Sequence, residues 1–270
     1  MRRERTFRTD GRLPYMHEPL PLSLIVITRD AANVLADCLA SVPFADEKIV
    51  VDSGSEDDTV AIAERFGARV LLHEWLGFGP QKNFAVQQAK NNWVLCIDAD
   101  ERVTEELTAA IRAVFATPPA AAAFAFARRN RFLGRWLAYG EGYPDWSVRL
   151  FDRARARWTD DPVHEHVVTD GSVVRLPGDL LHRSAESIET YVAKQNRYTT
   201  LQAQAMHARG EPAGALQLGL SPLVRFLRFY VLRRGFLDGA PGFAHISIGA
   251  FASFLKYAKL RALRADKGER

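Results

Sequence analysis

Short apolar runs alternate with amphipathic segments along the first half of the chain. The runs are rich in Val, Ile and Leu, which is typical of strands buried on both faces of a parallel sheet. They lie at 22–28, 48–51, 69–73 and 93–97, and helices are expected at about 31–41, 57–66, 80–90 and 104–115. Strands and helices that alternate with short links predict βαβ units with right-handed crossovers. The pattern therefore predicts an α/β fold with a parallel sheet.

The second half has a less regular pattern. Beyond residue 120, strands are expected at 122–127 and 146–151, and a long helix at 188–207. The apolar run 176–181 predicts a further strand that ends at His182. We interpret these elements as the continuation of one α/β domain.

Two carboxylates follow the fourth predicted strand, in the run Ile97-Asp98-Ala99-Asp100-Glu101. In open α/β sheets, ligands bind outside the carboxyl ends of the strands. Asp98 and Asp100 are therefore predicted to lie at the rim of a ligand crevice and to hold a hard divalent cation against a diphosphate. The alternative is that Asp100 only caps the helix that starts near Thr104.

Asp52 ends the second predicted strand and is followed by Ser53-Gly54-Ser55. The glycine allows a tight turn, and the hydroxyl and backbone N–H groups can bind a ligand or cap the next helix. A carboxylate at this position is able to accept a hydrogen bond from a base N–H or a ribose hydroxyl. The alternative is an ordinary capping loop, but acids at two strand ends favour ligand binding.

The composition is that of an ordinary globular protein, with 270 residues, a formal net charge of +4 and two cysteines. Cys38 and Cys96 lie on an apolar helix face and in a core strand, so both are expected to be buried thiols in a reducing cytosol. The excess positive charge lies at the ends: residues 215–270 hold ten Lys and Arg against three Asp and Glu, whereas 21–214 hold 21 against 26. This favours a basic surface-binding tail over a nucleic-acid-binding domain. Residues 1–20 are basic, contain no apolar segment of a secretory signal, and are expected to be disordered.

Several motifs together resemble one enzyme family. They are Thr28-Arg29-Asp30, Asp52-Ser-Gly-Ser-x-Asp-Asp-Thr, Ile-Asp98-Ala-Asp100-Glu, Gly-Phe-Gly-Pro-Gln-Lys-Asn at 77–83, Tyr-Pro-Asp-Trp-Ser-Val-Arg-Leu-Phe at 143–151, Val-His-Glu at 163–165 and Arg-Arg-Gly-Phe-Leu-Asp-Gly at 233–239. Their order and spacing resemble the GT-A glycosyltransferases of family 2. More narrowly, the chain is similar to bacterial lipopolysaccharide core β-glycosyltransferases of the inner-core glucosyltransferase type.

The resemblance implies a domain organisation. It predicts a GT-A, Rossmann-like, mostly parallel sheet flanked by helices over residues 21–214. The nucleotide-sugar half would be 21–117 and the acceptor half 118–214, followed by a helical extension at 215–270. The implied activity is the transfer of a hexose from a UDP-sugar to a lipopolysaccharide core or similar glycolipid, with inversion at the anomeric carbon.

The same resemblance implies roles for residues of the first half. Asp52 would hydrogen-bond the uracil, and Thr28, Arg29 and Ser53 would belong to the same nucleotide pocket. Asp98 and Asp100 would flank Mg²⁺ or Mn²⁺ on the diphosphate, with Asp100 the more direct ligand. Lys82 and Asn83 would lie near the sugar-nucleotide, and Lys82 would neutralise phosphate charge. The alternative for Lys82 is a solvated residue at the start of a helix.

The second half supplies two candidates for the base that takes the proton of the acceptor hydroxyl. Glu165 is favoured because it falls where the family usually has a Glu-Asp motif, and Asp145 is the second candidate. The chain has no true Glu-Asp pair, so the choice stays open. His182 is a candidate third metal ligand or a structural histidine. Zinc binding is not expected because His164 and His166 have no further Cys or His at ligand spacing.

The basic tail interleaves arginines with aromatic residues and leucines over 220–237. It lacks the run of about 20 apolar residues that a membrane span needs. This pattern predicts a segment that lies on an anionic membrane surface, here the cytoplasmic face of the inner membrane. The alternative is that the tail helices pack on the catalytic domain.

Rival functions remain open at this point. A polyprenyl-phosphate glycosyltransferase would share the donor half and differ in its acceptor. A sugar-1-phosphate nucleotidyltransferase is disfavoured because 28–33 contains no glycine. A non-catalytic membrane-surface binding protein would explain the basic ends but not the acids at two strand ends.

Overall fold

The computed structural model describes residues 18–161, 165–183, 187–212 and 214–265. The first half repeats a strand–helix unit. Its elements are β1 (Leu20–Thr28), α1 (Leu35–Ala40), β2 (Ala45–Asp52), α2 (Thr59–Arg65), β3 (Arg69–Leu72), α3 (Phe78–Gln87), β4 (Trp93–Cys96), β5 (Glu101–Val103) and α4 (Glu105–Val114).

The second half adds antiparallel strands and long helices. Its elements are β6 (Ala123–Phe132), β7 (Arg135–Trp136), β8 (Asp145–Asp152), β9 (Ala156–Trp158), β10 (Val167–Thr169), β11 (Val173–His182), α5 (Ile188–Ala208), α6 (Ala215–Leu227) and α7 (Gly239–Ala265). A π-helical turn (Arg228–Leu232) and a 3-10 turn (Gly235–Asp238) join α6 to α7.

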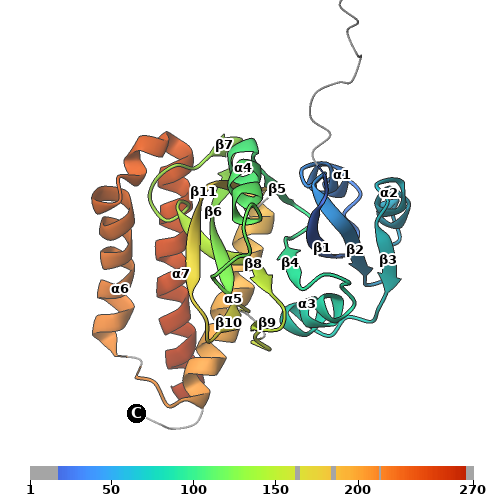
Figure 1. Cartoon of the computed structure of the whole chain (residues 1–270). Coiled ribbons are helices and arrows are strands. Elements are labelled where there is room, and N and C mark those ends of the chain that lie inside the picture. Colours follow the sequence, from blue (N-terminus) through green and yellow to red (C-terminus); the bar gives the residue numbers. More distant parts are fainter. Residues whose placement is uncertain (1–17, 162–164, 184–186, 213, 266–270) are drawn as a thin grey trace, which may run out of the picture.

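One sheet runs through both halves in the order β3-β2-β1-β4-β8-β6-β11-β5 (Figure 1). The strands β3, β2, β1 and β4 are parallel, and β8 lies antiparallel between β4 and β6. Beyond β8, β11 is parallel to β6 and β5 is antiparallel to β11. Because β5 directly follows the loop after β4 but pairs with β11, the far end of the sheet is brought back to the ends of the first strands.

The central strand β1 shows why the strands of the first half could be predicted from their apolar runs. Leu24 and Val26 belong to the core cluster on one face of the sheet, and Ile25 and Ile27 to the cluster on the other. A strand covered on both faces has no polar alternation, so it is a continuous apolar run. The helices α1, α2 and α4 cover the first face, whereas α3 covers the second.

The C-terminal helices form a hairpin that is joined to the second half. The helix α7 packs between α5 and α6 (Figure 1). Asp238, which is 1% exposed, accepts hydrogen bonds from the backbone N–H groups of Ala138 and Tyr139. Arg225 of α6 forms an ion pair with Glu141. The predicted extension is therefore helical and packs on the α/β part of the chain through α7, while α6 keeps an exposed face.

The sequence and the structure differ at some boundaries. The first helix begins at Leu35 rather than near 31, because Ala31–Val34 forms a turn. Residues 1–17, predicted to be disordered, lie outside the described residues, and Leu20 already belongs to β1. Cys38 and Cys96 are free and buried, as predicted. Burial raises the pKa of the Cys96 thiol to about 12.

Candidate functional site

The loop between β4 and β5 carries the two predicted carboxylates to the end of the sheet. The Asp98 oxygens face two cations, with Oδ1 at 3.1 Å from Lys82 Nζ and Oδ2 at 2.8 Å from Arg149 Nη2. Its backbone N–H donates to Glu101 Oε2. Burial raises the pKa of the Asp98 carboxyl, but the charges of Arg149 and Lys82 outweigh burial and hold that pKa well below its ordinary value. Asp98 is therefore an ionised carboxylate that two cations hold in place.

Lys82 lies inside α3 and is only 3% exposed. Its Nζ contacts Glu165 Oε1 at 3.0 Å in addition to Asp98, and it lies 4.4 Å from the centre of the Trp158 ring. The alternative of a solvated lysine is wrong. Lys82 joins one predicted site carboxylate, Asp98, to the favoured base, Glu165.

Arg149 of β8 extends the charged network on the other side of Asp98. Its Nη2 lies 2.7 Å from Oε1 of Glu101, a carboxylate with no exposed surface. Arg128 lies 3.6 Å from the same Glu101 oxygen and donates two hydrogen bonds to Asp145. The two candidate bases therefore lie at opposite ends of one chain of alternating charges.

Asp100 faces His182, the last residue of β11. The distance from Asp100 Oδ2 to His182 Nε2 is 3.2 Å. The other ring nitrogen, Nδ1, lies 2.6 Å from Asn130 Oδ1, and Asn130 Nδ2 donates to the carbonyl of Gly142. This second bond fixes the amide orientation, so Nδ1–H donates to Oδ1 and Nε2 is the ring nitrogen that faces Asp100. A histidine oriented in this way is the usual form of a metal ligand.

The start of α4 tests the alternative that Asp100 only caps this helix. The side chain of Thr104 accepts from the backbone N–H of Leu107, and Thr104 is the N-cap residue of α4. Asp100 is thus not needed as a cap. Among the described residues, no group of three or more His, Cys, Asp or Glu side chains forms a closed metal site. Asp100 and His182 supply two of the about six ligands that a hard divalent cation takes, so metal binding at this position stays a prediction.

The residues predicted for the nucleotide pocket differ in whether their side chains already have hydrogen-bond partners. Asp52 is 1% exposed and accepts from the backbone N–H groups of Gly54 and Ser55, so it holds its own turn. Ser53 accepts a hydrogen bond from Gln81. Thr28 lines a cavity, and its buried Oγ1 has no hydrogen-bond partner within the described part of the chain.

Arg29 and Asp30 also line this cavity and form an ion pair at 3.6 Å. Asp30 has a φ of +51°, a conformation that Asp tolerates better than most residues. Its backbone N–H donates to Ser55 Oγ, and its Oδ1 accepts from Glu56 N–H. These bonds join the loop after β1 to the loop after β2. The turn held by Asp52 is therefore next to Thr28 and Arg29, and nucleotide binding by these three residues stays a prediction.

Asn83 has a different setting. Its side chain exchanges two hydrogen bonds of 3.0 Å with the backbone of Trp158, which joins α3 to β9. This contact positions the aromatic ring beside Lys82. A direct contact of Asn83 with a nucleotide stays a prediction.

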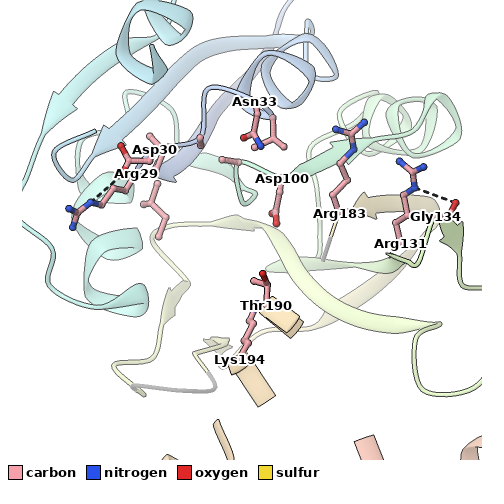
Figure 2. Close-up of a pocket in the computed structure, with 14 residues that line it drawn as sticks. Arg29, Asp30, Asn33, Asp100, Arg131, Gly134, Arg183, Thr190 and Lys194 are labelled. Atoms are coloured by element: carbon pink, nitrogen blue, oxygen red, sulfur yellow. Dashed lines mark hydrogen bonds and ion pairs between the residues drawn. The ribbon is translucent and has the colours of Figure 1, made fainter. Parts of the chain in front are cut away.

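Two cavities meet at the site. The first, of about 780 Å³, extends from Thr28 and Arg29 past Asp100 to Arg131 and Arg183 (Figure 2). The second, of about 610 Å³, is lined among others by Asp98, Arg149, Trp158, Glu165 and His182. Ile27, Asp100 and Lys194 line both cavities. Asp145 is not among the described residues that line either of them.

Sequence reasoning missed several residues of this arrangement. Arg149 and Glu101 lie inside motifs that the sequence analysis quotes, but neither was given a role. Their importance comes from the contacts of Arg149 with Asp98 and Glu101, which join residues distant in the sequence. Trp158, Arg131 and Lys194 carry no motif. Zinc binding at 164–166 cannot be followed, since His164 lies outside the described residues.

Comparison with known proteins identifies the class of the fold and site. The model of the family Glycosyl transferase family 2 matches residues 23–174. The chain belongs to this family of glycosyltransferases.

Individual relatives cover almost the whole chain. An uncharacterized glycosyltransferase of Rickettsia felis is 34% identical over 252 residues, which is 89% of each chain. The lipopolysaccharide core biosynthesis glycosyltransferase LpsC of Rhizobium meliloti is 30% identical over 255 residues, or 92% of this chain and 94% of its own. The fold is similar to a solved mannosyltransferase of Pyrobaculum calidifontis, PcManGT in complex with GDP-Man and Mn²⁺, with a TM-score of 0.51 at 17% identity over 96% of this chain and 92% of that one. The predicted GT-A fold is thereby confirmed.

Proposed function

We propose that the protein transfers a hexose from a UDP-sugar to a lipopolysaccharide core or similar glycolipid acceptor by metal-assisted single displacement. The observation that carries this proposal is the junction of the two cavities: Asp100 lines both and contacts His182, and the second cavity is also lined by Glu165. The name of the Rhizobium meliloti relative supports the acceptor class.

The donor would extend along the first cavity. Thr28 offers a buried hydroxyl that has no partner in the described part of the chain, and Arg29 and the Asp52 turn lie nearby. Asp100 and His182 would hold Mg²⁺ or Mn²⁺ against the diphosphate, and Asp98 would act as the carboxylate that organises this loop. When bound, such a cation neutralises the negative charge that develops on the leaving diphosphate.

Glu165 is the proposed base. It lines the second cavity, and Lys82 fixes the position of its carboxylate at 3.0 Å. Asp145 is instead held by two hydrogen bonds from Arg128. A base on the face opposite the leaving group gives a single displacement, so an α-linked UDP-sugar would yield a β-glycoside.

The test compares Glu165→Gln with Asp145→Asn as its matched control. We expect Glu165→Gln to lower kcat by about 10²–10⁴-fold, the usual share of a general base, while the Kd of UDP is unchanged. Asp145→Asn should retain most turnover. Turnover that survives in Glu165→Gln and disappears in Asp145→Asn would assign the base to Asp145. An α-linked product would refute single displacement.

An exposed apolar helix supports a lipid-linked acceptor. By length and composition, Ala215–Leu232 meets the criteria of a membrane-spanning helix, with a mean hydropathy of 1.2 and none of the segment buried. At about 1.5 Å per residue it is shorter than the 30 Å hydrocarbon core of a typical bilayer. Leu216, near the start of this segment, is 80% exposed, and Arg228, Arg233 and Arg234, at or beyond its other end, are also exposed. We therefore propose attachment to the cytoplasmic face of the inner membrane rather than a span.

Sedimentation with anionic lipid vesicles tests this attachment. Changing Arg228, Arg233 and Arg234 together to Gln should weaken binding roughly 100-fold, because each arginine contributes about 1 kcal/mol at such a surface. Arg65→Gln, an exposed arginine of α2, is the control. Unchanged sedimentation of the triple variant would refute electrostatic attachment.

The acceptor class needs a separate assay. A polyprenyl-phosphate acceptor would use the same donor cavity and the same membrane surface. Product formation with polyprenyl phosphate, and none with lipopolysaccharide core acceptors, would favour that second function. The reverse result supports the proposal.

A further inference from the structure

The ring of Trp146 lies on the wall of the second cavity. Trp146 belongs to β8 and is 38% exposed. It lies inside the quoted motif at 143–151, and the proposed function gives it no role. The same cavity is lined by Glu165, the proposed base. A large ring that stays exposed in a cavity beside a base is a candidate surface for the molecule that reacts there.

The sequence of β6 explains how this ring is placed. In the run Ala-Phe-Ala-Phe-Ala at 123–127, the phenylalanines belong to the core cluster on one face of the sheet, so the alanines lie on the other face. Trp146 pairs with Ala127, and Arg175 of β11 pairs with Ala125, which places both large side chains on the alanine face. Because alanine is small, side chains from β8 and β11 can meet above β6.

Arg175 holds the ring in this position. Its Cζ lies 4.7 Å from the centre of the Trp146 ring, within the range of a cation–π contact. Arg175 is not among the described residues that line the second cavity, whereas Trp146 is. The arginine therefore contacts the ring from outside the cavity, and the exposed surface of the ring is available to a ligand inside it.

The other tryptophan of this cavity is used differently. Trp158 is only 3% exposed, and its ring centre lies 4.4 Å from Lys82 Nζ and 5.6 Å from Arg149 Cζ. Its ring packs against the cations that hold Asp98. Of the two tryptophans, Trp146 is therefore the one that has surface to offer to a ligand.

We propose that the acceptor sugar stacks on the ring of Trp146 and that Arg175 is a positioning residue for this ring. The inference rests on the proposed function for the base and for the acceptor class. A pyranose has a face of C–H groups, and its hydroxyls project from the edge. An aromatic ring binds that face by apolar contact and leaves the hydroxyls free for hydrogen bonds, so one of them can reach Glu165.

The first experiment titrates lipopolysaccharide core oligosaccharide into the full-length protein saturated with UDP and Mg²⁺, by calorimetry. Trp146→Ala should weaken binding about tenfold, the effect of losing one aromatic contact, and Trp146→Phe should restore most of it. The control is Trp75→Ala, because Trp75 is 45% exposed and is not among the described residues that line either cavity. Equal affinity in Trp146→Ala and the wild type would overturn the proposal. Weaker binding of UDP to Trp146→Ala would also overturn it, since the ring would then serve the donor.

The second experiment measures steady-state transfer to the same oligosaccharide. Trp146→Ala should raise the KM for the acceptor about tenfold, with the KM for the donor unchanged. Arg175→Gln should raise the acceptor KM about threefold, because it removes one exposed cation–π contact and leaves the ring in place. A variant that only folds poorly would lower kcat without changing KM. That result in both variants would overturn the proposal.

The two proposals fail in different ways. Absence of UDP binding, with oligosaccharide binding that still depends on Trp146, would refute the donor and leave the sugar-binding surface standing. UDP binding and transfer to the oligosaccharide, with Trp146 variants that match the wild type in every assay, would refute the surface and leave the proposed function standing.

Discussion

The two cavities that meet at Asp100 are built in opposite ways. The second is lined by charges that already have partners: Asp98 with Lys82 and Arg149, and Glu165 with Lys82. The first contains a buried hydroxyl, Thr28 Oγ1, that has no hydrogen-bond partner among the described residues. A preformed network fixes groups for a reaction, whereas unmatched groups are suited to a ligand that completes them. Changes to the paired charges of the second cavity should therefore alter folding and turnover, and changes in the first cavity should alter binding of the donor.

The largest expected effect is on folding, in the network of the second cavity. Arg149→Met removes the cation that lies against Asp98 and the fully buried Glu101. Loss of one partner from a buried ion pair costs about 3–5 kcal/mol, so the free energy of unfolding should fall by that amount in urea denaturation. Arg157→Met, an exposed arginine of β9, is the control. A loss below about 1 kcal/mol would mean that the network is not buried as described.

A smaller effect with a characteristic pH dependence is expected at Asp98. Its pKa in the folded protein is lowered below the value of about 3.9 that an unfolded chain has. Its stabilising contribution is therefore complete above that pH and is lost as the pH falls through the folded value.

Asp98→Asn should lower the free energy of unfolding by about 2 kcal/mol at neutral pH. The difference from the wild type should shrink below about pH 4. Melting curves over the acid range measure this difference in stability. The control is Asp58→Asn, which changes an exposed aspartate. A difference that is constant with pH would contradict the ion pairing of Asp98.

The smallest effect is expected in the first cavity, at Thr28. Thr28→Val removes a buried hydroxyl that has no partner among the residues the structure describes, so the free energy of unfolding should be unchanged or slightly higher. UDP should bind about fivefold more weakly, the share of one hydrogen bond. The control Thr199→Val removes a buried hydroxyl that donates to the Asn196 carbonyl, and should destabilise the fold without altering UDP binding. If Thr28→Val destabilised the fold and bound UDP with normal affinity, the proposed contrast between the two cavities would be wrong.

The first half could be predicted because its information is local. Each buried strand is an apolar run, and the carboxyl ends of parallel strands share one edge, so acids after 22–28, 48–51 and 93–97 had to meet. The strands β5, β9 and β10 have three residues each, too few to show a period, and they were not predicted. Their positions follow from pairing with distant strands.

The site was predicted in part for the same reason. Asp100 and His182 were both proposed as metal ligands, and antiparallel pairing of β5 with β11 brings them together. The burial of Lys82 could not be predicted, because its partners Asp98 and Glu165 are distant in the sequence and the buried residues of its helix include the polar Gln81 as well as Ala85 and Val86. A charged residue whose burial depends on partners distant in the sequence produces no periodic pattern along its own helix.

The most direct test of a metal-dependent nucleotide-sugar site is calorimetric titration of UDP into the wild type and Asp100→Asn, each with Mn²⁺ and with EDTA. The wild type should bind UDP at least about tenfold more tightly with Mn²⁺ than with EDTA, because a cation between Asp100, His182 and the diphosphate adds charged contacts. Asp100→Asn should lose most of this difference. Equal UDP affinity in all four titrations, or no UDP binding in any of them, would contradict the account.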